Sequence, residues 1–380
     1  MSVDAAFPSS ISGVATAVPA FIGYTAKAAI DDRPVYLQPI PIDSLSAFEQ
    51  IFGTTSRGPL HDSIALFYAN GGAACVVVAV APDSETISAA GLLGGLRVIG
   101  ERHGVTMLVV PDAVLLPSIA DFGTVAQAML MQAGTLGDRF AILDVYGGAT
   151  VTAESLSSVI DAFRNAVGQE FLSYGAAYFP FLLATDGTTV SPPSAAMAGI
   201  YTALDATNGV WSAPANVAVQ GISRLTYALK ESEQEDLNVP IDGKAVDALR
   251  AFATGNLVWG ARTLDGNSND YRYIQVRRTL IYIEQSIKNA LDQFVFAPNT
   301  SVTWATVTAA ISSFLTSIWS QGGLLGATAS DAFTVQCGLG STMTGQDVLD
   351  GYMIVQVTLQ LVRPAEFIVL MFQQQMAGAA

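Results

Sequence analysis

Charge is scarce in this sequence. Asp, Glu, Lys and Arg together make up 13% of its 380 residues, against about 25% in an average soluble domain. Hydrophobic residues account for 51%, and the mean hydropathy is +0.42. This combination excludes an intrinsically disordered chain, because enough apolar surface is available for burial. A chain of this length buries roughly three quarters of its unfolded surface and can build a large core.

Cysteine, histidine and basic residues are also few. Cys75 and Cys337 lie far apart, and neither has another Cys or a His at metal-ligand spacing. The sequence therefore predicts no disulfide scaffold and no metal site, and reduced thiols are typical of assembly in the cytoplasm. With 17 basic against 32 acidic residues, the net charge is −15. Nucleic acid is not an expected partner, unless basic charge is concentrated locally.

Long apolar runs are missing as well. A transmembrane helix needs about 20 apolar residues, whereas the longest runs, 73–82 and 367–372, have the length of strands. The N-terminus lacks a basic segment and carries Asp4, so we expect neither a secretory signal nor direct membrane insertion. The apolar residues must then be buried in a core or against other protein chains.

Motifs of catalysis and cofactor binding are absent. No G-x-G-x-x-G follows a predicted strand, and neither a P-loop nor a G-x-S-x-G motif occurs. The only imidazoles, His61 and His103, are expected in a solvated first helical turn and in a surface loop. Asp144 and Asp186 end predicted strands, where α/β enzymes place catalytic groups, but they could equally cap the next helix or turn. We expect no enzyme and no cofactor, with a Rossmann-like α/β enzyme as the alternative.

Strands and helices alternate over the first half of the chain. Pro39 and Pro41 place one strand at a sheet edge, and Ser46 with Glu49 forms a capping-box pattern for a short helix. Four continuous apolar runs that alternate with helices predict a parallel α/β sandwich. The predicted strands are 20–25, 35–42, 75–81, 105–110, 140–145 and 176–181. The predicted helices are 46–53, 64–70, 87–99, 118–132, 152–167 and 194–206.

The alternation stops after residue 207. Long helices are predicted over 271–295 and 304–319, a charged loop or helix face over 230–236, and strands over 353–361 and 367–372. The predicted fold is a three-layer parallel-sheet α/β sandwich, followed by an α+β domain, with extended strand arms at both ends. The expected boundaries are 1–20 for the N-terminal arm, 21–206 and 207–362 for the domains, and 363–380 for the C-terminal arm.

One basic island stands out in the acidic chain. Arg262, Arg272, Arg277 and Arg278 fall within 17 residues, and Lys288 follows. Two hypotheses remain open for it. The residues form salt bridges inside the subunit, or they form a docking face for an acidic protein partner.

Several strings of this sequence resemble the contractile tail sheath family of contractile phage tails, R-type bacteriocins and extracellular injection systems. The combination of G-V-W-x-A-P-A-N, R-Y-I-x-V-R-R and R-P-A-E-F is the most specific part, and Tyr271 stands where the family often has Trp. The strings span almost the whole chain in the family's order. They are PAFIGYT (19–25), AYFPFL (177–182), PPSAAMAGIYTALDATNGVWSAPAN (192–216), LNVPIDG (237–243), DYRYIQVRRTLIYIEQSIKNAL (270–291) and RPAEFIVLMF (363–372).

The resemblance implies a structural subunit that polymerises as stacked hexameric rings around an inner tube. Contraction of this polymer would drive the tube through a target envelope, without a nucleotide. The implied partners are copies of the chain, the inner tube protein, and baseplate and terminal cap proteins. The implied location is the cytoplasm during assembly and then a phage tail or tail-like particle, which can be extracellular. Another self-assembling shell protein is a second alternative.

The resemblance also implies candidate site residues. Terminal arms of family members add strands to a neighbour's sheet, although an intramolecular edge strand stays open for the C-terminal one. The implied arm residues are Val14, Ala15, Thr16, Phe367, Ile368, Val369, Leu370, Met371 and Phe372. The candidate tube-docking residues are Arg272, Arg277, Arg278 and Lys288. The helix predicted over 304–319 is an equally plausible tube-facing element.

Overall fold

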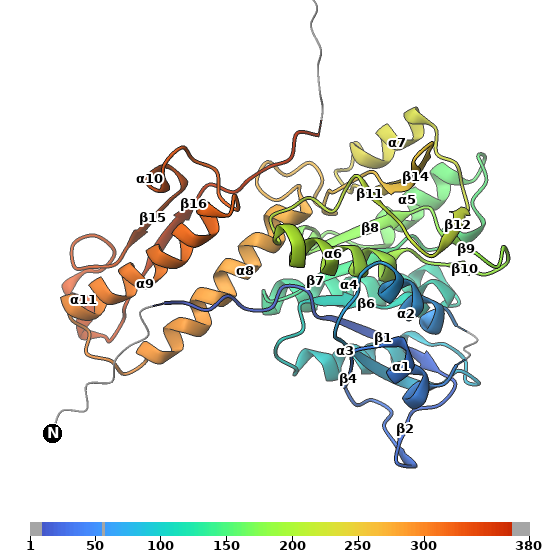
Figure 1. The fold of residues 1–380 in the computed structure, drawn as a ribbon, viewed down its shortest axis with the longest axis horizontal. Helices are drawn as coiled ribbons and strands as arrows, with labels where there is room; N and C mark the ends of the chain where they lie inside the picture. The colour runs from blue at the N-terminus through green and yellow to red at the C-terminus, as the bar shows by residue number, and fades with distance from the viewer. Residues whose placement is uncertain (1–9, 55–57, 367–380) are drawn as a thin grey trace, which may run out of the picture.

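The structure is a computed structural model that describes residues 10–54 and 58–366. Its centre is a nine-stranded sheet, drawn on the right in Figure 1. In spatial order the strands are β11 (Val217–Ala218), β14 (Gly255–Val258), β13 (Asp247–Phe252), β8 (Gly175–Phe179), β7 (Phe140–Asp144), β6 (Met107–Val109), β1 (Pro19–Thr25), β5 (Cys75–Pro82) and β4 (Ile40–Ile42). The pairings from β13 through β5 are parallel, whereas β4, β14 and β11 are antiparallel additions at the edges.

Helices cover both faces of this sheet, which confirms the predicted three-layer sandwich. One core contains Ile22 of β1 with α3 (Ala89–Gly100), α4 (Ile119–Leu136) and α5 (Leu156–Ala166). The other contains Phe21, the neighbour of Ile22, because successive side chains of a strand point to opposite faces. The helices of this second face are α1 (Leu45–Phe52), α2 (Leu60–Ala69) and α6 (Ser194–Asn208).

Local signals explain where several helices begin. Ser118 caps α4, where its hydroxyl accepts a hydrogen bond from the Asp121 amide (3.1 Å). In α1 the cap is Ser44, whose hydroxyl accepts from the Ala47 amide (3.2 Å), so the predicted capping box at Ser46 and Glu49 is wrong. The strand predicted over 35–42 is reduced to β4, because two prolines limit its pairing to the edge of the sheet.

The sheet continues beyond residue 207, where we predicted a domain boundary. Strand β13 pairs in parallel with β8, and β14 and β11 follow it at the same end of the sheet. The expected boundary at 206/207 therefore falls inside the sheet. The charged stretch in this region forms α7 (Glu231–Asn238).

The C-terminal unit is α+β, as predicted. Helices α8 (Ile274–Leu291) and α9 (Ser301–Ser320) pack with an antiparallel pair of strands, β15 (Phe333–Gln336) and β16 (Gln356–Leu359), around a third apolar core. In Figure 1 this unit lies to the left, and α8 reaches from it to the sandwich. Among the described residues, α9 is the helix that is long and apolar enough to span a membrane. One side of it is buried in the third core.

Smaller elements complete the described chain. A three-stranded sheet and a two-stranded hairpin lie beside the sandwich. Their strands are β10 (Val190–Ser191), β9 (Leu182–Ala184), β12 (Ile222–Leu225), β2 (Ala29–Ile30) and β3 (Arg33–Pro34). The short helices are α10 (Ala329–Ala332), α11 (Gly345–Leu349), η1 (Pro111–Leu115), η2 (Gly148–Thr150), η3 (Leu172–Tyr174) and η4 (Asp292–Phe294).

Candidate assembly surfaces

The N-terminal segment before β1 lies along α8 (Figure 1). The Val14 amide donates a hydrogen bond to the Ser286 hydroxyl (3.1 Å), and the Thr16 carbonyl accepts one from Arg278 (3.0 Å). Residues 10–18 form no strand in the structure, which suits the predicted extended arm. Val14 and Thr16 therefore contact their own subunit here, whereas Ala15 between them is exposed. The other expected arm residues, 367–372, lie outside the described residues.

Arg277 of the basic island is buried, with 6% of its surface exposed. Its guanidinium stacks between the rings of Tyr271 and Tyr174, at 3.8 and 4.3 Å from their centroids. It also donates a hydrogen bond to the Ser173 hydroxyl (3.0 Å). Cation–π contacts of this kind gain strength when they are desolvated. Arg277 thus fastens the start of α8 to the segment that precedes β8.

Arg278 is buried too, with 5% exposed. It forms a bidentate ion pair with Asp205 near the end of α6, at 2.6 and 3.0 Å. Its guanidinium also lies over the Tyr201 ring, 4.6 Å from the centroid. One side chain therefore joins α8, α6 and the N-terminal segment, since its third contact is the Thr16 carbonyl. For Arg277 and Arg278 the structure favours internal contacts, the first of the two hypotheses.

Two other members of the island, Arg272 and Lys288, differ from these two. Arg272 is partly exposed and donates to the Ser268 carbonyl and to Asn269 Oδ1, both in its own loop. Lys288 is exposed on the last turn of α8. The four predicted docking residues are therefore not one surface. Two of them hold the fold together, and two reach solvent.

The candidate catalytic carboxylates have structural partners. Asp144 accepts hydrogen bonds from the Ser194 amide (2.8 Å) and hydroxyl (2.6 Å) at the start of α6. Burial raises the pKa of this carboxyl to about 7, although the bonds from Ser194 oppose the shift. Asp186 accepts from the amides of Thr188 and Thr189 (both 2.9 Å) and stabilises a tight turn. The capping interpretation is confirmed for Asp186, whereas Asp144 binds the start of α6, 50 residues further along the chain, and not the next helix.

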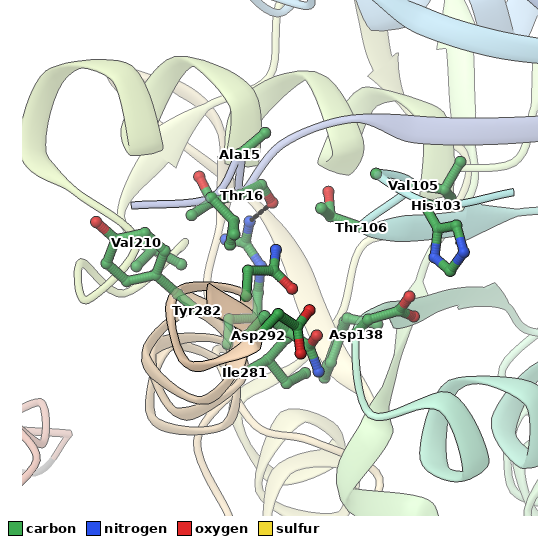
Figure 2. A pocket seen from close by; sticks show the side chains of 16 residues that line it. Ala15, Thr16, His103, Val105, Thr106, Asp138, Val210, Ile281, Tyr282 and Asp292 are labelled. Atoms are coloured by element: carbon green, nitrogen blue, oxygen red, sulfur yellow. Dashed lines mark hydrogen bonds between the residues drawn. The ribbon is translucent and has the colours of Figure 1, made fainter. Parts of the chain in front are cut away.

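A cleft of about 310 Å³ lies between the N-terminal segment, α8 and the start of β6 (Figure 2). The lining of the cleft contains both polar and apolar residues. Its polar groups include the side chains of His103, Asp138 and Asp292. Within residues 10–54 and 58–366, no cluster of three or more His, Cys, Asp and Glu side chains could hold a metal ion. The cleft also contains no serine or cysteine beside His103. The residues that line this cleft therefore do not form a nucleophile–histidine arrangement of the catalytic kind.

His61 lies in the first turn of α2, as predicted, and contacts two carboxylates. Its ring nitrogens are 3.1 Å from Asp62 and 3.2 Å from Glu49. The hydrogen bond with Asp62 raises the pKa of His61, burial lowers it in part, and the bond with Glu49 raises it further. The net shift is upward, so the charged imidazole stabilises the fold.

This shift predicts a pH-dependent contribution to stability. The stabilisation is complete below the unfolded-state pKa of about 6.5 and is lost as the pH rises through the higher folded-state pKa. We expect His61→Gln to lower the free energy of unfolding by about 1 kcal/mol at pH 5.5 and by less at pH 9. Urea unfolding at both pH values measures the difference. A loss that is equal at both, or larger at pH 9, contradicts the assignment.

An apolar groove is the largest feature that the sequence did not predict. Its volume is about 1080 Å³, and it runs between the last turns of α8 and β16. Its lining is mainly aliphatic and includes Ile283, Ile287, Leu291, Val355, Val357 and Leu359. Beside it, the sheet of β15 and β16 has only two strands in the described part of the chain. A two-stranded sheet is marginal by itself, so this groove and these strand edges suit the attachment of further protein.

Comparisons with known proteins agree with this arrangement. A family model described as the phage tail sheath C-terminal domain matches residues 267–375. The PVC sheath complex of an extracellular contractile injection system, solved in the contracted state, shares 34% identity with a TM-score of 0.79, over 96% of this chain and 94% of that one. The helical sheath of the anti-feeding prophage, also contracted, shares 31% identity with a TM-score of 0.78, over 99% of this chain and 100% of that one.

A more distant relative is the tail sheath protein of Burkholderia phage BcepMu. It is 25% identical over an alignment of 236 residues, and the match covers 57% of this chain and 48% of the phage protein. The chain thus matches about half the length of this curated relative. In the second curated relative, a putative prophage major tail sheath protein of Pseudomonas aeruginosa, the matched part is 57%.

A large sandwich joined to a small unit with open strand edges and an apolar groove suits a protein that assembles with other chains. The chain is 34% and 31% identical to two solved sheath proteins over nearly their full length, which narrows this class to sheath proteins. The chain belongs to the contractile tail sheath protein family. The family and the fold are those of structural sheath subunits.

Proposed function

We propose that this protein polymerises as stacked hexameric rings around an inner tube, and that the polymer contracts to drive the tube through a target envelope. The observation that carries the proposal is the match to two contracted sheaths over nearly their whole chains. The protein acts without enzymatic chemistry. It assembles in the cytoplasm with the tube, baseplate and cap proteins, and it then forms part of a phage tail or an extracellular tail-like particle.

Strand addition is the proposed link between rings. Residues 14–16 of one subunit, once released from their own α8, and residues 367–372 of another would pair with the open edges of β15 and β16. Two observations support this. The N-terminal segment is already extended, and the two-stranded sheet has unpaired backbone groups along its edges in the described chain. Added strands satisfy these groups, and their side chains set the register.

Tube docking is proposed for the two island residues that reach solvent, Lys288 and Arg272. Lys288 is exposed on α8, away from the buried pair Arg277 and Arg278. A cation there would attract an acidic tube surface, and its contribution would be greatest at low salt.

Co-expression with the tube protein and negative-stain microscopy test the proposed function. We expect long, regular rods with a central tube, and Lys288→Glu is expected to lower tube attachment at least several-fold at low salt. Lys27→Glu is the matched control, because Lys27 is also exposed but lies between β1 and β2 of the sandwich unit and not on α8. Monomers at high concentration, flat sheets or closed shells would contradict the sheath. Equal attachment of both variants would contradict the docking role.

A further inference from the structure

The carboxylate of Glu366 binds the C-terminal segment to the sandwich. Arg262 donates two hydrogen bonds to it, from Nε to Oε1 (2.8 Å) and from Nη2 to Oε2 (2.6 Å). Asn238 Nδ2 donates to Oε1 (2.7 Å), and the Tyr273 hydroxyl donates to Oε2 (2.9 Å). Each carboxylate oxygen thus accepts two bonds. We call these four residues the Glu366 clasp.

The donors of the clasp come from three parts of the chain. Asn238 ends α7, Tyr273 precedes α8, and Arg262 lies between β14 and that helix. Burial alone would raise the pKa of Glu366, but the hydrogen bonds from Arg262 and Asn238 hold it below its usual range. The carboxylate is therefore ionised, and its bidentate pair with arginine is of the strong, geometrically specific kind.

Arg262 is itself held rigidly. Only 3% of its surface is exposed, and its Nη1 donates to the Gly266 carbonyl (2.8 Å). Its backbone amide donates to Asp247 Oδ1 (2.8 Å), and Asp247 belongs to β13, which pairs with β8 in the large sheet. A continuous set of short contacts therefore leads from Glu366 into the central sheet.

The position of the clasp along the chain suggests what it does. β16 ends at Leu359, and Leu361 still bridges to Leu324 in the C-terminal unit. The five residues 362–366 then cross to the sandwich, where Glu366 is bound. Glu366 thus lies near the start of the proposed C-terminal arm, 363–380, and directly before its candidate strand residues 367–372.

We propose that the Glu366 clasp anchors the root of the C-terminal arm, so that tension on the arm passes to the nine-stranded sheet instead of to β16. This inference rests on the proposed function for the source of the tension. Without the clasp, tension would act on the end of β16 and open its pairs with β15 one after another. Only four residue pairs join these strands, so little would resist it. With the clasp, tension on the arm is transmitted through the buried Arg262 to the nine-stranded sheet.

The experiment compares single variants of the full chain, Glu366→Ala and Glu366→Gln, with the wild type. The control variant is Glu101→Ala, which removes an exposed carboxylate at the end of α3. Hydrogen exchange of the soluble subunit is measured first. Loss of charged hydrogen bonds is expected to speed exchange at residues 361–366 roughly tenfold or more in the Ala variant. The Gln variant, which keeps the shape and one acceptor, should show a smaller increase. The control should match the wild type.

Sheaths of the same variants are then triggered to contract and measured by microscopy. We expect Glu366→Ala sheaths to break into fragments several-fold shorter than wild-type or Glu101→Ala sheaths, with faster exchange at β16. Contracted Glu366→Ala sheaths of wild-type length overturn the proposed path of tension. If neither the wild type nor any variant forms sheaths, the proposed sheath function is contradicted, but the role of the clasp is not. Hydrogen exchange of the soluble subunit still tests the anchoring role of Glu366. Unchanged exchange at residues 361–366 in Glu366→Ala would overturn that role.

Discussion

Removing residues 367–380 is expected to give a subunit that folds normally but forms no continuous sheath. The Glu366 clasp and the three cores of the described residues are kept in this truncation, so the melting temperature should stay within about 2 °C of the wild type. Assembly should fall to single rings or short stacks, because in the proposed strand addition each missing arm removes a strand of inter-subunit hydrogen bonds. Differential scanning calorimetry measures the fold, and negative-stain microscopy measures rod length.

A second truncation separates the arm from its root. Removal of residues 364–380 also deletes Glu366 and leaves the buried Arg262 guanidinium without its carboxylate. This longer truncation should lower the stability of the subunit, since an unpaired buried charge is costly. The comparison shows whether assembly or folding is affected. Rods of normal length from the 367–380 truncation would refute the arm hypothesis, and a large fall in its melting temperature would show that these residues belong to the core.

Local pattern predicts most elements of this fold, but it predicts neither the order of the strands nor their full number. The run 75–81 is β-branched and apolar, and it is a strand buried on both faces. Ser118 stands directly before an apolar periodic stretch, and it caps α4. By contrast, β1 lies between β6 and β5, and β13 joins β8 after an interval of some 70 residues. Such pairings depend on long-range packing, which leaves no local periodicity.

The candidate site shows the same limit. The basic island was visible in the sequence, but the acidic partners that decide its role were not. Asp205 lies 73 residues before Arg278, and Glu366 lies 104 residues after Arg262. Both partners belong to strings that carry the family resemblance, the one around G-V-W and the one that contains R-P-A-E-F. The resemblance therefore pointed to the segments that contain both acidic partners. Only the three-dimensional structure shows that these carboxylates pair with the arginines of the island.

The buried pair Arg278–Asp205 gives the largest expected loss of stability from a single substitution. Asp205→Ala leaves a guanidinium that is 5% exposed without its carboxylate. Breaking a buried pair from one side typically costs about 3–5 kcal/mol, and urea unfolding of the subunit measures this loss. Arg278→Glu would place two carboxylates together, so it should prevent folding before any effect on tube docking could be seen.

Two controls test whether the pair itself is responsible. Lys288→Ala, on the exposed side of the same helix, should change the free energy of unfolding by less than about 0.5 kcal/mol. The double variant Arg278→Met with Asp205→Leu should lose less than the two single changes together, because no charge is then left buried and unpaired. Hydrogen exchange at residues 14–18 adds a structural readout, since Arg278 also binds the Thr16 carbonyl. A loss below about 1 kcal/mol for Asp205→Ala, with unchanged exchange, would mean that the pair does not hold the N-terminal segment to α8.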